Sequence, residues 1–342
     1  MPRFTTLFAL LSSVLALTSA RSPPTDSINI THSLTPRWYS LPGPTRFGDV
    51  GTWPVIGRDP TEGNIQPIRY CYGDGFTAWT TSTLVHAAIE YWRHAADQSA
   101  FDIILDPGCE GNYWCLCSSL EQPSDALHIY NAGVDNTQDS GSTLGYQYNS
   151  DLSGRHRMDI RNFDSSDVEN FIKGVVGVTH EFGHVAGLAH EHQHPNRDAS
   201  LVFNCFNLEG YEQATEDIKD NLPFMPFCWS GCDAMHGPSN SGSSVIGLQY
   251  FPALVDYVVG NRIAKFSGYY SSPEWDRWSI MNYNSYGGDA ANHGTFPDGA
   301  VLVGRGQNGE PDFEVFQGGF ADKAQAMPSE GDVERIKELY PY

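Results

Sequence analysis

One stretch of the 342-residue chain places histidine and glutamate at metal-binding spacing: residues 180 to 190 have the sequence HEFGHVAGLAH. His180 and His184 are four residues apart, so on a helix both imidazoles lie on one face, one turn apart, and can reach the same metal ion. Glu181 follows the first histidine and can accept a proton from metal-bound water without binding the ion itself. The spacing therefore predicts a helical metal site with a carboxylate base beside it.

The end of the same stretch can supply a third ligand. A continuing helix would take residue 190 away from the ion, but a glycine can adopt the left-handed conformation that ends a helix, so Gly187 can return His190 to the metal. Three neutral imidazoles leave one zinc position open for water, as catalytic zinc sites require. His192 and His194 are alternative third ligands. The position of Gly187 favours His190, and we expect the other two around the ligands or on the surface.

Three helices are predicted from their starts and from apolar residues at helical spacing. One of residues 165–167 (SSD) can cap the helix that runs into the histidine stretch. An earlier helix can begin at Thr81 or Ser82. The last helix has Ser329 and Asp332 at capping-box spacing, with aspartate in place of the usual glutamate or glutamine.

Alternating apolar and polar residues predict strands around Ile68, Phe101, Leu127 and Met158. The order along the chain is therefore strand, helix, several strands and then the helix with the histidines. This order indicates an α+β or α/β sheet domain whose second helix holds the candidate metal ligands.

Two motifs resemble those of a known family. The stretch His180–Asp198, HEFGHVAGLAHEHQHPNRD, resembles the extended HExxHxxGxxHExxRxDRD signature of the astacin family of zinc endopeptidases, within the metzincin clan. His194 stands where the family has arginine. Downstream, Ser279–Tyr283 (SIMNY) resembles the family's Met-turn, SxMHY, with Asn282 in place of histidine. The C-terminal PSEGDVERIKELY also resembles a family helix, and the similarity extends from about Ile65 to the end.

The resemblance implies a fold and several roles. A metzincin-like α+β fold has an N-terminal twisted sheet with two long helices, an irregular C-terminal subdomain that ends in a helix, and a cleft between them. Met281 would lie beneath the zinc ligands, and Tyr283 would be an extra zinc ligand at rest that moves to stabilise the oxyanion. Glu191 would receive the new N-terminus made by activation. Residues 47–49 (FGD) are one residue short of the family's latency motif FxGD, which makes Asp49 a candidate latency ligand.

The charge balance limits the partners. The chain has 20 Lys plus Arg against 41 Asp plus Glu, a formal net charge of −21. A surface of this kind repels nucleic acid phosphates and anionic membranes. We therefore expect no nucleic acid or membrane partner. The resemblance to zinc endopeptidases implies protein or peptide substrates, and we expect a monomer.

The N-terminus indicates secretion. Arg3 precedes an apolar run from Leu7 to Leu17, and a small-residue cleavage site follows at Ala20, as in a signal peptide. Asn29 begins the N-x-[ST] glycan acceptor Asn-Ile-Thr. We expect a secreted, extracellular zymogen with three segments: a signal peptide (1–20), a loosely structured pro-segment or N-terminal arm (21–60) and a zinc metalloprotease catalytic domain (61–342).

Seven cysteines fit an oxidising compartment, in which six of them can form three disulfide bonds of unknown connectivity. The close spacing of Cys109, Cys115 and Cys117 predicts a loop bonded to itself or to a neighbour. A cysteine zinc site is less favoured, because paired C-x-x-C spacing is absent.

The sequence therefore predicts a secreted endopeptidase with one catalytic Zn²⁺ held by His180, His184 and His190. Two alternatives stay open: a different metzincin family, or a secreted binding protein with a structural zinc. Glu181 argues against the second, since a structural site does not need that carboxylate and is usually closed by a fourth protein ligand. A serine hydrolase is disfavoured because the chain lacks G-x-S-x-G.

Overall fold

The structure is a computed structural model. The residues that it describes are 39–43, 49–59, 63–97, 99–109, 114–120, 123–133, 140–149, 151–161, 167–221, 257, 269–285, 295–306, 308–315 and 327–342. The chain divides into two units, 1–35 and 36–342, and everything below concerns the second unit. The predicted signal peptide and the glycan acceptor at Asn29 lie outside the described residues.

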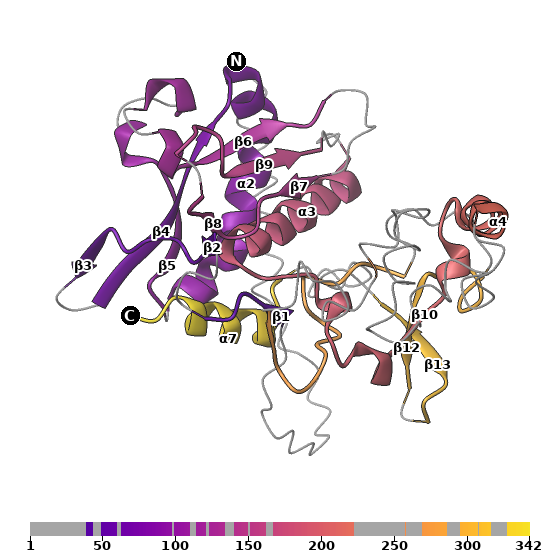
Figure 1. Ribbon diagram of the computed structural model, residues 1–342. Coiled ribbons are helices and arrows are strands. Elements are labelled where there is room, and N and C mark those ends of the chain that lie inside the picture. Colours follow the sequence, from indigo (N-terminus) through magenta and orange to yellow (C-terminus); the bar gives the residue numbers. More distant parts are fainter. Residues whose placement is uncertain are drawn as a thin grey trace. The chain divides into compact units, whose positions relative to one another are not determined.

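A six-stranded mixed sheet forms the main layer (Figure 1). Its central strands are parallel: β4 pairs in parallel with both β5 and β6, and β6 pairs in parallel with β9. Antiparallel strands β3 and β7 pair with β4 and β9, and β7 ends the strand order β3-β4-β6-β9-β7. The bounds are β3 (Gly57–Asp59), β4 (Gly63–Tyr72), β5 (Phe101–Leu105), β6 (Leu127–Asn131), β7 (Gly141–Ser142) and β9 (Arg157–Ile160). The four strands predicted from alternating residues are confirmed.

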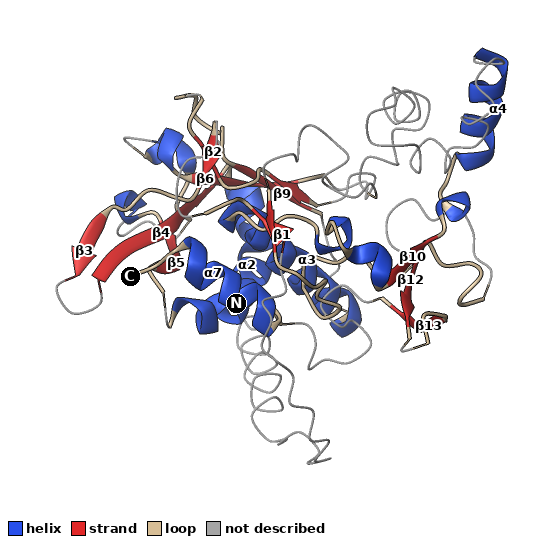
Figure 2. Ribbon diagram, turned by 60° about the horizontal axis from the view of Figure 1, so that its bottom comes forward, coloured by secondary structure: helices blue, strands red, loops and turns tan. Residues whose placement is uncertain are grey.

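Two long helices pack on one side of this sheet, α2 (Gly75–Ala96) and α3 (Val168–Ala186), as Figure 2 shows. The indole Nε1 of Trp92 on α2 donates to the Thr179 carbonyl of α3 at 2.9 Å. Asp167 caps α3, because its side chain accepts from Glu169 N. It is one of the three residues, 165–167, that the sequence offered as the cap of this helix. The mixture of α and β structure agrees with the predicted fold class.

The predicted start of the first helix at Thr81 or Ser82 is wrong. The helix begins at Gly75, because the Asp74 side chain accepts hydrogen bonds from Thr77 N at 2.8 Å and from Thr77 Oγ1 at 3.0 Å. Thr81 lies inside the helix, where its hydroxyl donates to the Thr77 carbonyl four residues back. A threonine can make either bond, so its type alone does not locate a helix start.

The last helix, α7 (Glu330–Leu339), begins with the predicted capping box. Ser329 Oγ accepts from Asp332 N at 3.0 Å, and the Asp332 carboxylate accepts from Ser329 N at 2.9 Å. Ile336 and Leu339 are fully buried in the same apolar core as α2 and α3. Aspartate therefore replaces glutamate in this box without loss of the reciprocal bonds.

Part of the segment predicted as a loosely structured arm packs into the main core. Tyr39, Leu41 and Trp53 are almost completely buried. Strands β1 (Tyr39–Ser40) and β2 (Val50–Gly51) pair with β11 (Tyr270–Ser271) and β8 (Tyr146–Gln147). These buried residues are separated by prolines and glycines, so they show no helical or strand period in the sequence.

A second apolar cluster lies in the C-terminal part of the chain. It contains Leu201, Tyr257, Trp275, Val301 and Leu302 among its buried residues. The associated elements are β10 (Leu201–Phe203), α4 (Tyr211–Asn221), β12 (Leu302–Arg305) and β13 (Pro311–Glu314). Short 3-10 helices complete the described elements: Pro107–Cys109, Cys117–Ser119, Pro123–Asp125, Glu191–Gln193, Arg197–Ala199 and Cys205–Asn207.

Disulfide bonds join Cys71 to Cys117 and Cys109 to Cys115, so the prediction of a cysteine-bonded loop is confirmed. Cys205 is disulfide-bonded too. Cys228 and Cys232 lie outside the described residues. Among the residues that the structure describes, no helix has the length and apolar character needed to cross a membrane.

Candidate metal centre

Three histidine side chains meet at the C-terminal end of α3. One ring nitrogen of each of His180, His184 and His190 lies within 4.8 Å of the others. The closest pair is His184 Nε2 and His190 Nε2, which are 2.9 Å apart. The first two histidines lie on one face of the helix, and the third reaches them after the chain has turned.

Backbone carbonyls fix the orientation of two of these rings. His180 Nδ1 lies 2.8 Å from the Ile280 carbonyl, and His184 Nδ1 lies 2.8 Å from the Leu188 carbonyl. A carbonyl oxygen can only accept, so each Nδ1 must hold the proton and each Nε2 keeps its lone pair. This arrangement is typical of histidines that ligate a metal through Nε2.

The chain turn depends on Gly187. Its φ is +107°, the left-handed conformation that the sequence predicts for it, and its N–H bonds to the carbonyls of Gly183 and His184. The turn is also held from outside the helix, because Leu41 N donates to the Gly187 carbonyl at 3.0 Å. A side chain at residue 187 would be strained by the positive φ and would press on Leu41.

Met281 packs directly beneath the histidine helix. A Cβ built on Gly183 would collide with the Met281 sulfur, so the glycine permits this close approach. Met281 is buried, and its carbonyl accepts from Glu191 N at 3.0 Å. The methionine thus packs against α3 at Gly183, while its backbone contacts the segment that follows His190.

Burial keeps the three imidazoles neutral. It lowers the pKa of His184 to about 4, and it lowers the pKa values of His180 and His190 well below the ordinary histidine value. For His180 and His190, repulsion from His184 acts in the same direction. Neutral imidazoles are the form that binds a divalent metal, so the donor set fits Zn²⁺ without any proton having to be displaced.

Glu181 is buried beside these rings and contacts the edge strand of the sheet. The Ser142 hydroxyl, on β7, donates to Glu181 Oε2 at 2.7 Å. Burial raises the pKa of Glu181 to about 7, the Ser142 hydrogen bond opposes this rise, and the Asp159 charge adds to it. A carboxyl group that titrates near neutral pH suits a general base. Sequence reasoning missed Ser142, because nothing near residue 142 indicates that it reaches residue 181.

His192 and His194 are fully buried, so neither lies on the surface. Both ring nitrogens of His194 are hydrogen-bonded. Nε2 donates to the Ser272 carbonyl at 3.0 Å, and Nδ1 accepts from Asn196 N at 3.1 Å. His192 Nδ1 accepts from Tyr283 N at 3.2 Å. The group of three nitrogens within reach of one ion therefore includes His190 and neither of these two.

Tyr283 lies against the histidine cluster. Its ring centroid is 4.5 Å from that of His190, and its ring stacks on His192 at 4.2 Å with 29° between the planes. Tyr257 meets it edge-on at 5.7 Å and belongs to the second apolar cluster. The tyrosine thus connects the histidines to the C-terminal part of the fold.

Glu191 is buried in a polar setting behind His190. Its Oε1 accepts from Asp276 N at 2.9 Å, and the backbone N–H of Tyr39 bonds to the same carboxylate. Burial raises the pKa of Glu191 well above the ordinary value, and the charges of Asp276 and Asp332 act in the same direction. Glu191 therefore joins the N-terminal strand β1 to the segment before the Met-turn.

Asp332 holds the Met-turn in place from the start of α7. Its carboxylate accepts from Ser279 Oγ at 2.6 Å and from Ile280 N at 2.8 Å. Within the turn, Asn282 Oδ1 accepts from Trp275 Nε1 at 3.0 Å. The helix cap at Asp332 was predicted from the sequence, but its bonds to residues 279 and 280 were not, because no local pattern reports a contact over fifty residues.

Two further candidates contribute less. Asp49 is exposed and its carbonyl accepts from Tyr148 N at 2.7 Å, so its latency role stays a prediction. Cys71, Cys117 and His128 also lie close enough to share an ion. Both of these cysteines are joined in a disulfide bond, and their sulfurs are therefore not the thiolates that bind zinc.

Comparison with solved structures finds similar proteins over most of the chain. High choriolytic enzyme 1, a hatching enzyme zinc-protease from Oryzias latipes (medaka fish), is 12% identical, with a TM-score of 0.48 over 86% of this chain and 97% of that one. Two structures of myroilysin are 18% and 17% identical, with TM-scores of 0.45 and 0.39, over 85% and 87% of this chain and 96% and 94% of theirs. No protein-family model and no curated protein sequence matches the chain.

Proposed function

We propose that this protein is a zinc-dependent endopeptidase that resembles the astacins. One observation supports this most directly: three neutral imidazoles converge, two of them with Nδ1 fixed on a backbone carbonyl, and a buried glutamate follows the first ligand. His180, His184 and His190 would hold one Zn²⁺. When bound, the ion supplies a Lewis acid that polarises the scissile carbonyl and acidifies water.

Glu181 is the general base and then the general acid. It takes a proton from the attacking water and delivers this proton to the leaving amine, which restores its carboxylate. The hydrogen bond from Ser142 fixes the direction of the carboxylate. Because the carboxyl group is buried, its pKa lies close enough to neutrality for both transfers.

Tyr283 donates its hydroxyl proton in a hydrogen bond to the oxyanion of the tetrahedral intermediate. Its ring lies beside His190 and stacks on His192, which places this residue next to the proposed zinc ligands. A donor of this kind contributes about 2.7–4 kcal/mol to the stability of the transition state. Met281 supports the ligands from below through its contact with Gly183.

An extended substrate adds to the sheet at β7. This strand ends the strand order of the described sheet, so its outer side can accept main-chain hydrogen bonds from a peptide. Ser142, which contacts Glu181, lies on the same strand. A peptide paired with β7 would therefore run past the catalytic carboxylate.

Activation cleavage falls before Tyr39. The chain from Tyr39 to Leu41 is buried, and its backbone bonds to Glu191 and to Gly187, so a mature enzyme that lacked it would lose part of its core. Asp49 is then a latency ligand only if its segment can reach the histidines before activation. The test is Asp49→Ala in the uncleaved chain: unmasked activity supports latency, and unchanged latency excludes it.

The rival function is a secreted binding protein with a structural zinc. A structural site is usually closed by a fourth protein ligand. Among the described residues only three histidines form this group, and the buried Glu181 has no part in closing it. The geometry therefore favours hydrolysis.

The decisive experiment compares the activated protein with its Glu181→Gln variant on an unfolded protein substrate, with the zinc content of both measured. We expect one zinc in each, and a rate at least about 100-fold lower in the variant, since general acid–base catalysis contributes roughly 10²–10⁴. Equal zinc content with no cleavage by either protein, after every N-terminal truncation up to Tyr39, would instead support the binding protein.

A further inference from the structure

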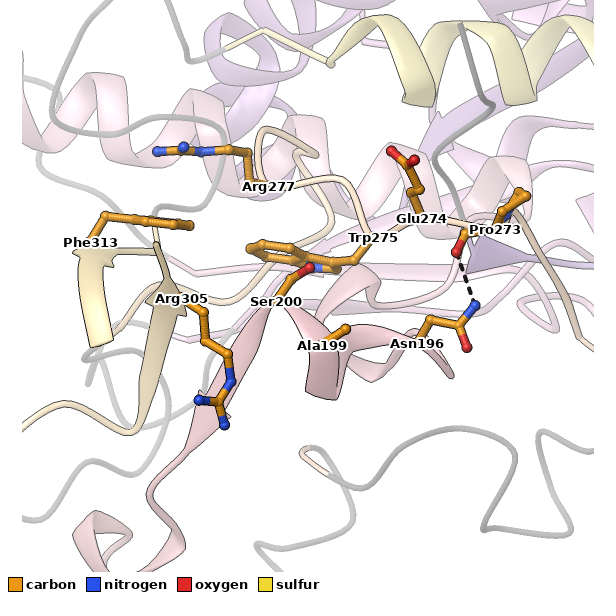
Figure 3. A pocket seen from close by; sticks show the side chains of 9 residues that line it. All are labelled: Asn196, Ala199, Ser200, Pro273, Glu274, Trp275, Arg277, Arg305 and Phe313. Carbon is orange, nitrogen blue, oxygen red and sulfur yellow. Dashed lines mark hydrogen bonds between the residues drawn. The ribbon is translucent and has the colours of Figure 1, made fainter. Parts of the chain in front are cut away.

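Among the described residues, a cavity and a cluster of side chains lie outside the histidine cluster, and of the two it is the side-chain cluster that has converging donor atoms. The cavity has a volume of about 310 Å³ and lies in the C-terminal part of the fold. Figure 3 shows that the Arg277 and Arg305 side chains in its wall point apart, on opposite sides of Phe313, so one anion cannot accept from both. The side-chain cluster lies on the main sheet and consists of two cysteines and a histidine.

This second cluster contains Cys71, Cys117 and His128. One ligand atom of each residue lies within 4.8 Å of those of the other two, and all three side chains are buried. Cys71 and Cys117 form a disulfide bond, so their sulfurs are not thiolates in this state. Reduction of the bond supplies two thiols beside one imidazole, and thiolates with imidazole are a donor set that zinc and related cations prefer.

The sheet places Cys71 and His128 side by side without help from the disulfide. The two residues are direct partners in the parallel pairing of β4 with β6. Tyr70 and Tyr72 belong to the main apolar core with α2 and α3, and side chains alternate along a strand, so Cys71 points to the opposite face of the sheet. His128 is the partner of Cys71 in the pairing and therefore lies on that same face.

Backbone contacts also hold Cys117 close to the sheet. The segment that carries it bridges to β4, where Tyr72 N donates to the Cys115 carbonyl at 2.8 Å. The disulfide bond between Cys109 and Cys115 closes the loop before this segment. The Cα atoms of Cys71 and Cys117 are 5.1 Å apart, and zinc–sulfur bonds are about 2.3 Å long. Both sulfurs therefore stay within reach of one ion when the bond between them is reduced.

The charge of the complex also suits a buried site. The cysteines lie in an apolar cluster with Ala126, and Leu120 packs against it. A divalent cation with two thiolates and a neutral imidazole has no net charge, whereas an uncompensated charge in such surroundings is strongly unfavourable. Burial keeps free thiols protonated, and a bound cation deprotonates them.

We propose that Cys71, Cys117 and His128 bind one Zn²⁺ or a similar cation when their disulfide is reduced, so that disulfide and metal are alternative states of one site. A dithiol supplies the two electrons and two protons and is itself oxidised to a disulfide; the S–S bond breaks and each sulfur takes one proton. The cation then replaces both protons. The site is separate from the histidine cluster and does not depend on the proposed peptidase activity.

The test adds Co²⁺ alone to the full chain, which carries Glu181→Gln to remove any self-cleavage. A phosphine first reduces the disulfides and becomes a phosphine oxide, with its oxygen from water. Thiolate ligands give Co²⁺ an intense sulfur-to-metal charge-transfer absorption, which the three imidazoles of the histidine cluster do not give. We expect this absorption in the reduced chain and not in the oxidised chain.

Three substitutions locate the site. Cys71→Ser should abolish most of the absorption. His128→Ala should weaken Co²⁺ binding at least about tenfold, because even the loss of a group that only orients a ligand costs about 10- to 100-fold. His86→Ala, the matched control at an exposed position on α2, should leave the affinity within about twofold. Equal weakening by the two histidine variants, or an unchanged absorption in Cys71→Ser, would overturn the proposal.

A further variant covers the case in which the reduced chain does not fold, as judged by circular dichroism. Cys117→His frees the Cys71 thiol, keeps the bond between Cys109 and Cys115, and needs no reductant. The site then has one thiolate and two imidazoles, so Co²⁺ should give a weaker charge-transfer absorption, which the added change His128→Ala removes. Absence of the absorption from Cys117→His, or from a reduced chain that keeps its fold, contradicts the proposal.

The other disulfide in this region is an internal control for the two alternative states. With Zn²⁺ bound, oxidised glutathione should re-form the bond between Cys71 and Cys117 several-fold more slowly, since metal-bound thiolates are not free to attack. The bond between Cys109 and Cys115 should re-form at the same rate with and without Zn²⁺, as followed by mass spectrometry of trapped peptides. Equal slowing of both bonds would show a general effect of zinc and would overturn the proposed competition.

Discussion

The histidine helix and the Met-turn segment that faces it are built in opposite ways. Helix α3 places His180 and His184 through the helical period alone, and a left-handed glycine brings His190 back. The segment 272–285 has no regular period. It is held by side chains from elsewhere, including Glu191 at Asp276 and Asp332 at Ile280.

The difference has a functional meaning. Spacing along one helix can select a metal, but the orientation of each imidazole depends on groups that are distant in sequence. The His180 ring is fixed by the Ile280 carbonyl, one hundred residues away. Substitution of a histidine on α3 should therefore prevent metal binding. Substitutions in the segment 272–285 should instead lower the stability of the protein and disturb the orientation of the imidazoles.

The largest expected effect is at a ligand. His184→Ala removes one of three donors, so zinc should be lost and peptidase activity should fall to background. Zinc at about 100 times its Kd should raise the unfolding free energy of the unaltered protein by about 2.7 kcal/mol and that of the variant by almost nothing. His86→Ala, at an exposed position on α2, is the control and should retain both zinc and activity. Full zinc binding by His184→Ala would contradict the proposed ligand set.

The second prediction concerns the segment 272–285, which Asp332 holds in place. Asp332→Ala removes the acceptor for Ser279 Oγ, Ile280 N and Ser329 N, and leaves the first two of these donors fully buried. The unfolding free energy should fall by about 2–4 kcal/mol, while zinc binding is retained. Urea unfolding with a zinc assay measures both.

Glu330→Ala is the matched control for this substitution, because Glu330 is an exposed acid in the same first turn of α7. It should cost less than about 1 kcal/mol, the size of a helix-dipole contribution. Similar losses for the two variants would mean that Asp332 acts on the helix and not on the Met-turn.

The same contrast explains what the sequence predicted. The strand around Ile68, the helix with the histidines and the Ser329 capping box all have local periods or caps, and each is present. The start of α2 was misplaced because Asp74 and Thr81 are both capable caps. The burial of Tyr39 and Trp53 and the contact of Ser142 with Glu181 depend on distant partners, so no local pattern reports them.

The third prediction concerns the contact between the two regions. Gly183→Ala places a methyl group where the Met281 sulfur lies, so it should destabilise the protein by about 1–3 kcal/mol, as overpacking does. Gly177→Ala, six residues earlier on α3, meets no atom within 4 Å and should be neutral or stabilising by up to about 1 kcal/mol. Thermal unfolding measures the change in stability of both variants. A destabilised Gly177→Ala would show that α3 tolerates no added side chain and that Met281 is not the cause.

The smallest effect is expected at Ser142, and it should appear in the pH profile. Glu181 must be ionised to act as a base, so activity falls as the pH drops through its pKa, which is about 7 without a metal and lower beside a bound dication. The Ser142 hydroxyl donates to the carboxylate, stabilises the ionised form and so lowers this pKa. Ser142→Ala should therefore move the acidic limb of kcat/KM to higher pH, with a loss of several-fold near pH 6 and a smaller loss near pH 8.

Two controls sharpen this measurement. Ser142→Thr keeps a hydroxyl and should restore most of the profile, and Thr143→Ala, whose side chain accepts from Arg157 N instead, should leave it unchanged. A limb that stays in place in Ser142→Ala, with kcat/KM lowered equally at every pH, would mean that Ser142 positions the substrate strand and not the base. Strand β7 would then resemble the segment 272–285, because it would support the site without changing the pKa of Glu181.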